Sequence, residues 1–372
     1  MTAHVSSHDH DHDHDRGSGP GGGSGTSGTP MRVSGPEGLL TALPAMLGFA
    51  PDDSLVTILL GGRHGRSMVA VARHDLAELR GPEPRRAAIA AQVGRVCAQE
   101  QVTAVLMVVI DPQWRFGVDD RWQREIVEDL AWTLSADKIE LRDALLCTRI
   151  AAGAEWIGLG DDRCGRLSDP RQSAMAAAYV YQGRTLYGSR AEMAQVLAPG
   201  IVDPAVAEAL AALPTAPPAP DLGDRTDRDR DRAAVQRLCT VLAAGTGAGE
   251  LPADELVQIA TDVLRPDVRD SLLGLAVGPL AAGAERFWAE ATRVLPAPWR
   301  AETAALFAFT AYARGEGPPA GIGVEAALTA RPGHRLATLL SEALGNGMHP
   351  DRIRELAEVG VACAQDLGVR LP

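Results

Sequence analysis

Four polar side chains stand where predicted strands end. Arg73, His74 and Asp75 close one β-rich run, and Asp111 directly follows another. Because ligands of open α/β sheets bind beyond the carboxyl ends of parallel strands, these positions are the first candidates for chemistry. An imidazole oriented by a carboxylate can transfer protons, so His74, Asp75 and Asp111 are the candidate catalytic residues.

Each of these residues also has a structural interpretation. Adjacent residues of an extended chain point to opposite faces, which argues against direct pairing of His74 with Asp75. A carboxylate at the end of a strand is more often a helix cap or a turn former, and this applies to Asp111. The structural interpretation is therefore favoured at each position.

Three side chains are candidates for binding a ligand: Arg73, Trp156 and Arg190. Trp156 and Cys164 bracket a polar loop, residues 158–162, that is rich in glycine and aspartate. A loop of this kind serves either as a lid or as a simple connection. The sequence places none of the three candidates in a recognisable binding motif.

A tract near the N-terminus alternates histidine with aspartate, and its imidazoles are His8, His10, His12 and His14. Imidazole and carboxylate at short spacing can ligate Zn²⁺, Ni²⁺ or Cu²⁺. No apolar frame surrounds the tract to hold the ligands in place. The favoured interpretation is a solvated tail that binds metal adventitiously.

No cofactor is expected. Gly23, Gly25 and Gly28 satisfy the GxGxxG spacing, but no strand precedes them and no helix follows, so the phosphate site that this motif creates is missing. The single lysine, Lys138, follows an aspartate and not a glycine-rich turn, which excludes a P-loop. A GxSxG nucleophile elbow does not occur either.

The elements that must position these residues alternate in type. We predict a mixed, partly parallel sheet with flanking helices in an α/β domain over residues 30–213. A helix at 39–47 leads into a hairpin, and a βαβ crossover then implies a parallel pair at the centre of the sheet. The predicted strands are 54–60, 67–73, 102–110 and 144–150, with a further strand at 155–159, and the helices between them are 84–100 and 121–135.

The remainder of the chain divides into a tail, a linker and a helical domain. Residues 1–29 lack apolar periodicity and are expected to be disordered. Prolines and the charge run 224–232 predict a linker over 214–232, and the run itself is a solvated linker or the start of a helix. Residues 233–372 predict an all-α domain. It repeats a small, large, small, proline pattern that resembles a tetratricopeptide unit: Ala284, Trp288, Ala291 and Pro296, then Ala320, Val324, Ala327 and Pro332.

Composition narrows the cellular setting and the partners. A formal net charge of −12 disfavours binding to nucleic acid, and residues 271–284, the longest weakly polar stretch, are too short to cross a bilayer. The start of the chain lacks the features of an export signal. Five cysteines, odd in number and widely spaced, indicate reduced thiols and a cytoplasmic location.

The motif LGFxPxxSLV at 47–56 resembles the opening of an actinobacterial family catalogued as domain of unknown function 4192. Further matches extend over roughly 36–356 and include Arg73-x-Asp75-Leu76, Cys164-Gly165, Asp169-Pro170, Ser189-Arg190 and Pro332-Gly333-His334. The family often carries a second cysteine and a second aromatic residue near Trp156, where this chain has Ile157 and Leu159, and this weakens a metal or redox role for Cys164. The resemblance implies an architecture and a cellular setting, but no reaction.

Two functions of different class remain. The preferred one is a cytoplasmic interaction or ligand-sensing module, with a crevice near Asp111 and Arg73 and a helical half that docks a protein partner. The alternative is a small-molecule enzyme, a hydrolase or transferase, with its site at the strand ends. Convergence of Arg73, Asp75, Asp111 and Trp156 on one pocket would favour the enzyme.

Overall fold

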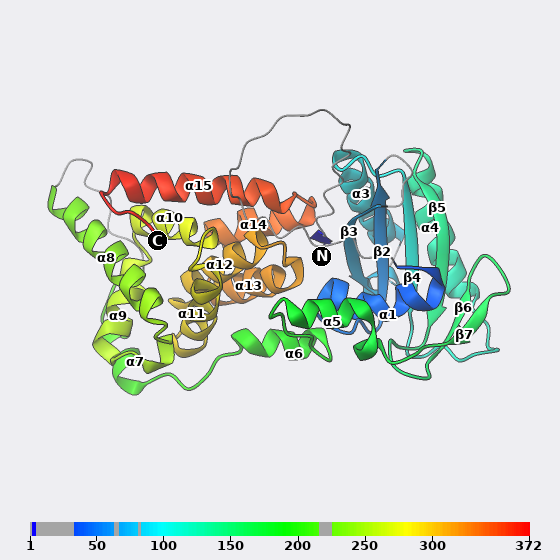
Figure 1. The fold of residues 1–372 in the computed structure, drawn as a ribbon, viewed down its shortest axis with the longest axis horizontal. Helices are drawn as coiled ribbons and strands as arrows, with labels where there is room; N and C mark the ends of the chain where they lie inside the picture. The colour runs from blue at the N-terminus through cyan, green and yellow to red at the C-terminus, as the bar shows by residue number, and fades with distance from the viewer. Residues whose placement is uncertain (1, 5–32, 63–66, 81–82, 216–224) are drawn as a thin grey trace, which may run out of the picture. The chain divides into compact units, whose positions relative to one another are not determined.

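A computed structural model describes residues 2–4, 33–62, 67–80, 83–215 and 225–372 of the chain (Figure 1). Contacts divide the chain into two compact units. The α/β unit comprises Val5–Leu186, and the helical unit comprises Tyr187–Pro372 together with Met1–His4. The units therefore divide N-terminal to the predicted linker at 214–232.

The N-terminal tail is described only at Thr2–His4, which form the short strand β1. The rest of the segment that was expected to be disordered lies outside the described residues. The same holds for the expected adventitious metal ligands His8, His10, His12 and His14.

The six strands that lie within the α/β unit form a mixed sheet in the order β3-β2-β4-β5-β6-β7. Only β4 and β5 pair in parallel, whereas the other neighbours in this order are antiparallel. The predicted mixed, partly parallel sheet is thereby confirmed. The strands are β2 (Ser54–Gly61), β3 (Ser67–Asp75), β4 (Ala104–Ile110), β5 (Glu140–Cys147), β6 (Glu155–Gly158) and β7 (Cys164–Arg166).

Strand β5 differs from its prediction at both ends. It begins at Glu140 and ends at Cys147, whereas the apolar run predicted a strand over 144–150. Its first four residues alternate between exposed and half-buried positions, and all but Leu141 are charged. Because the prediction relied on apolar residues, it missed the solvated start of the strand.

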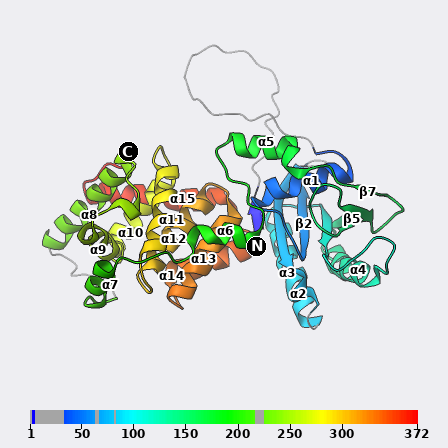
Figure 2. The ribbon, with the colours of Figure 1, turned by 90° about the horizontal axis from the view of Figure 1, so that it is seen from below.

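Helices cover both faces of this sheet. Figure 2 shows α1 and α5 on one side of the strands and α3 and α4 on the other. The helices of the unit are α1 (Gly35–Leu47), α2 (Leu76–Leu79), α3 (Glu83–Gln99), α4 (Arg121–Ser135) and α5 (Ala174–Tyr181), with a 3-10 turn η1 (Pro170–Gln172). Helix α1 ends at Leu47 and is capped by Gly48, whose φ of 78° is the left-handed conformation that glycine adopts most readily.

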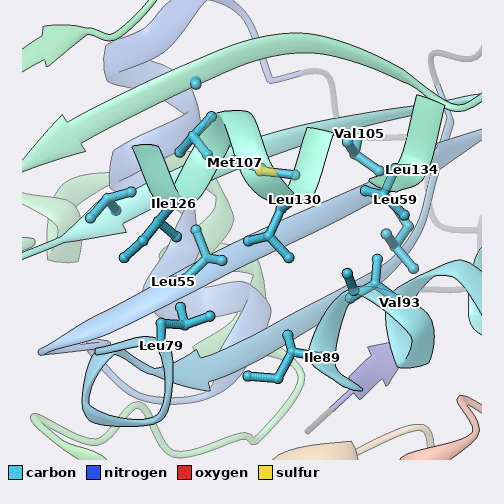
Figure 3. Close-up of a cluster of buried hydrophobic side chains, with 14 of the residues drawn as sticks. Leu55, Leu59, Leu79, Ile89, Val93, Val105, Met107, Ile126, Leu130 and Leu134 are labelled. Atoms are coloured by element: carbon cyan, nitrogen blue, oxygen red, sulfur yellow. The ribbon is translucent and has the colours of Figure 1, made fainter. Parts of the chain in front are cut away.

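A hydrophobic core joins the sheet to α3 and α4 (Figure 3). Helix α4 contributes Ile126, Leu130 and Leu134, which recur every fourth residue and so lie on one face. Leu55 of β2 and Met107 of β4 meet them from the sheet. This core fixes α4 relative to the carboxyl end of β4.

The helical unit has no strand within residues 225–372. All fourteen residues of α12 are buried, so α12 is the central helix of the unit. The helices are α6 (Arg190–Ala194), α7 (Pro204–Ala211), α8 (Arg225–Ala244), α9 (Ala253–Asp262), α10 (Pro266–Leu273), α11 (Ala281–Val294), α12 (Arg300–Ala313), α13 (Gly317–Ala330), α14 (Arg335–Gly345) and α15 (Pro350–Asp366), with 3-10 turns η2 (Gln195–Leu197), η3 (Ala248–Glu250) and η4 (Gly274–Ala276).

The repeated pattern of small and large residues falls on α11 and α13, which both pack against α12. Its helical positions are all buried: Ala284, Trp288, Ala291, Ala320, Val324 and Ala327. Gly323 shows how closely α13 approaches, since a Cβ there would lie 2.8 Å from the Cβ of Ala308. The small residues therefore allow close helix packing, while a true repeat array stays a prediction.

The charge run at 224–232 is the start of a helix from Arg225 onward, one of its two predicted interpretations. Its charged side chains make contacts within the helical unit. Asp231 is buried and binds the Arg265 guanidinium, while Arg228 and Arg232 donate to the carbonyls of Asp366 and Leu367 at the end of α15. These arginines satisfy carbonyls that the end of a helix leaves without partners.

The motif Pro332-Gly333-His334 forms the turn between α13 and α14. Gly333 has a φ of 81°, and His334 caps α14 because its Nδ1 accepts a hydrogen bond from the Ala337 amide at 3.2 Å. The His334 Nε2 lies 3.1 Å from Glu302 in α12. Burial alone would raise the pKa of Glu302, but His334 and Arg331 outweigh it and hold that pKa below its ordinary value.

No helix among the described residues has both the length and the apolar character that crossing a membrane requires.

Candidate functional site

Strand pairing brings the predicted strand-end residues to one edge of the sheet. Ser54, at the start of β2, pairs with Asp75 at the end of β3 and with Ile110 at the end of β4. Ile110 in turn pairs with Cys147, which pairs with Trp156. The strand-end positions Arg73–Asp75 and Asp111 therefore lie along the carboxyl edge of β4 and β5.

Arg73 and Asp75 form an ion pair on one face of this edge. The Arg73 Nη2 lies 2.5 Å from the Asp75 carboxylate, and its Nε donates to the Ser54 hydroxyl at 2.8 Å. The guanidinium also lies 6.0 Å from the centre of the Phe49 ring. Arg73 is thus engaged with Asp75, with Ser54 and, through the Asp52 carbonyl at 3.3 Å, with the turn that precedes β2.

His74 points to the opposite face, as alternation along a strand requires. It is buried, and its Nε2 has no hydrogen-bond partner among the described residues. Burial lowers the pKa of His74 to about 3, and the positive charge of Arg73 adds to this effect. The imidazole is therefore neutral at neutral pH, and the Asp75 carboxylate is bonded to Arg73 and not to this ring.

Asp111 is a buried carboxylate at the end of β4. One of its oxygens accepts from the backbone amide of Gln113 at 2.9 Å and from Arg80 at 3.3 Å. The other oxygen accepts from the side chain of Gln123 in α4 at 2.9 Å. Asp111 thus forms the turn after β4 and ties that turn to α4, which is the structural role expected for such a carboxylate.

Arg80 links Asp111 to the turn before β2. It contacts Asp53 at 3.3 Å, and its guanidinium lies 4.8 Å from the centre of the Trp122 ring. Asp53 has a φ of 41°, the left-handed region that aspartate enters more readily than most residues. The edge therefore holds two ion-pair clusters, one around Arg73 and one around Arg80.

The loop at 111–120 leaves this edge and presents apolar side chains. Trp114 is buried and meets the Phe116 ring edge-on, with ring centres 6.4 Å apart. Phe116 itself is 50% exposed and Val118 is 59% exposed. Gly117, with a φ of 79°, shapes the turn, and the Val118 amide closes it by donating to the Arg115 carbonyl at 3.0 Å.

Sequence reasoning did not single out this aromatic pair. Trp114 and Phe116 fall in a ten-residue segment, DPQWRFGVDD, that is otherwise rich in turn-forming and charged residues. Two aromatic residues in such a segment are unusual, and this is the feature of the sequence that could have indicated a contact surface. Only the structure shows that one is the buried anchor of the other.

Buried polar atoms without partners accompany the Asp111 cluster. The Gln123 Oε1 and the Trp114 Nε1 are both buried and have no hydrogen-bond partner among the described residues. Such atoms are uncommon in folded proteins. The cluster therefore keeps one acceptor and one donor that the fold does not use.

The remaining candidates are placed elsewhere. Trp156 is buried in β6, where its indole lies against Gly165 of β7, since a Cβ on Gly165 would come within 2.9 Å of it. Arg190 begins α6 in the helical unit, where it pairs with Glu325 of α13. Arg73, Asp75 and Trp156 thus share a sheet edge with Asp111, but their side chains are engaged in separate contacts.

Thiols and metal ligands are not gathered at this edge. Within the part of the chain that the structure describes, no group of three or more His, Cys, Asp or Glu side chains could hold a metal ion. Cys147 is buried at the end of β5, and burial raises its pKa above the ordinary value of a thiol. Cys164, in contrast, is exposed on β7.

A family model described as a domain of unknown function matches residues 36–351. This match extends over parts of both compact units and includes the carboxyl edge of the sheet. No curated protein and no solved structure shows a significant match to the chain.

Proposed function

Since the chain belongs to the family described as domain of unknown function DUF4192, whose description assigns no activity, we propose from geometry that the α/β unit is an interaction module. Its contact surface is the loop at 111–120, and its partner is a protein. The observation that carries this proposal is the exposure of Phe116 and Val118 on a loop that the buried Asp111 and Trp114 anchor.

Anchoring matters because binding requires ordered side chains. A loop that is already fixed loses less conformational entropy when a partner docks on it. Phe116 packs edge-on against Trp114, and the Asp111 carboxylate accepts the Gln113 amide, so these contacts order the first part of the loop. Aromatic residues of this kind are enriched at protein interfaces.

The test is affinity capture of the full-length tagged protein from an extract of the cells that produce it. We expect Phe116→Ala to reduce recovery of a protein partner about tenfold or more, the effect of losing one aromatic contact. Tyr181→Ala is the matched control, because it also removes an exposed aromatic side chain, which is 93% exposed but lies on α5 and not on this loop.

Equal recovery of the same partner with wild type and Phe116→Ala would refute a contact through this loop. Capture of a bound metabolite without a protein partner would instead support ligand sensing or a small-molecule enzyme. The enzyme remains the alternative, but the contacts of His74 and Asp75 supply no acid/base pair in its favour. A cytoplasmic location is part of this proposal and rests on the reduced thiols that the sequence indicates.

A further inference from the structure

Trp132 of α4 is 82% exposed, in contrast to four other tryptophans that are buried: Trp114, Trp156, Trp288 and Trp299. Leu130 and Leu134 flank it in sequence and point into the core (Figure 3). The exposure of Trp132 places its indole on the outer face of α4. Tryptophan is rarely left this exposed by folding alone, and it is strongly enriched among residues that dominate binding energy. The outer face of α4 is therefore a candidate contact surface.

Carboxylates precede Trp132 on the same face. Glu125, Glu128 and Asp129 stand seven, four and three residues before it, spacings that place side chains along one side of a helix. The side chains of Glu125 and Asp129 are 65% and 54% exposed. An exposed indole bordered by exposed carboxylates is suited to a cationic group.

The neighbouring cations do not neutralise this face. Arg86 of α3 lies 3.1 Å from Asp129 and 3.8 Å from Glu125, while Arg124 binds Asp120 at 2.8 Å. Arg86 is therefore shared by Glu125 and Asp129, and Arg124 is bonded to Asp120. With Glu128 included, four carboxylates are matched by two arginines, which leaves a net negative charge. Charge complementarity then selects a positively charged partner.

We propose that this α4 face, defined by Glu125, Glu128, Asp129 and Trp132, docks an arginine-bearing segment of a partner protein. The guanidinium stacks on the indole and donates to the carboxylates. The same helix already binds an arginine in this way, because Arg80 lies over Trp122 while its guanidinium contacts Asp111. Arginine suits such a site better than lysine, since its planar group stacks and donates at the same time.

The test uses the full-length protein and a fluorescein-labelled alanine-based peptide with arginines at positions i and i+4. Fluorescence anisotropy should show binding that weakens as salt is added, because exposed charges are screened. The same peptide with glutamine in place of arginine should not bind. Trp132→Ala should weaken binding roughly tenfold, which corresponds to a loss of about 1.4 kcal/mol.

Two further variants separate this surface from general attraction to an acidic protein. Glu128→Gln should weaken binding by removing one exposed carboxylate. Tyr181→Ala, which removes a 93% exposed aromatic residue from α5, should leave binding unchanged. Unchanged spectra by circular dichroism would show that each variant is folded, as exposed positions lead us to expect.

Three results would overturn the proposal: no binding of the arginine peptide, equal binding by wild type and Trp132→Ala, or an equal loss with Tyr181→Ala. Because Phe116 is not part of this face, the outcome is independent of the loop at 111–120.

Discussion

His74 shows how one buried side chain couples protonation to stability. Burial lowers its pKa from 6.5 to about 3 in the folded protein. As the pH falls below about 6.5, His74 therefore binds a proton in the unfolded chain but stays neutral in the folded chain. The contribution of His74 to the free energy of unfolding is therefore fully present above the unfolded pKa of 6.5, and it is lost as the pH falls.

We expect this contribution to fall by about 1.6 kcal/mol between pH 6.5 and pH 5, because the unfolded imidazole is half protonated at pH 6.5 and the loss then approaches about 1.4 kcal/mol per pH unit. His74→Gln, which cannot be protonated, should show a smaller loss over the same interval. Urea unfolding followed by circular dichroism at both pH values measures the difference. Equal losses in wild type and variant would contradict the burial of a neutral imidazole.

Helix α8 illustrates how much depends on where an element packs. Its first turns read as a uniform run of alternating charge, yet Asp231 is 4% exposed whereas the Asp229 side chain is 71% exposed. Asp231 binds Arg265, a residue of the turn between α9 and α10. Removing Asp231 leaves the partly buried Arg265 guanidinium with only the more exposed Asp227 carboxylate, at 3.3 Å, as a counter-charge.

Asp231→Ala should therefore lower the free energy of unfolding by about 3 kcal/mol. Asp229→Ala is the matched control on the same helix and should change it by less than about 0.5 kcal/mol, because exposed ion pairs contribute little. Thermal and urea unfolding of both variants would measure these changes. Similar effects from the two substitutions would mean that Asp231 is not buried as described.

At the scale of the whole molecule, proteolysis can test where the chain divides into its two compact units. Limited proteolysis is expected to cut before about residue 30 and within 214–224, the part of the predicted linker that precedes α8. The second cut would separate α6 and α7 from the rest of the helical unit in sequence, but α7 packs against α9 and η2 packs against α11. The two fragments should therefore stay together.

Size-exclusion chromatography of the clipped protein under native conditions would show this association as co-elution. Separation of the fragments would mean instead that the chain divides at 214–232, as the sequence predicts, and not between Leu186 and Tyr187. Protection of 214–224 from cleavage would show that the part of the predicted linker before α8 is not accessible.

The sequence by itself determined the local elements of this protein, because the spacing of apolar residues over a short segment distinguishes a helix from a strand. The helix at 121–135 and the parallel pair of β4 with β5 follow from such patterns and are confirmed. Local patterns also placed Arg73, Asp75 and Asp111 at strand ends, which strand pairing then brought to one edge.

Tertiary structure alone decided how each side chain is used. Trp114 and Trp132 are the same residue type, yet one is buried as an anchor and the other is exposed. Asp229 and Asp231 differ in the same way. Burial depends on which distant segment packs against a position, and the residues next to that position do not indicate which segment this is. For this reason the exposed aromatic residues and the buried ion pairs emerge only from the fold.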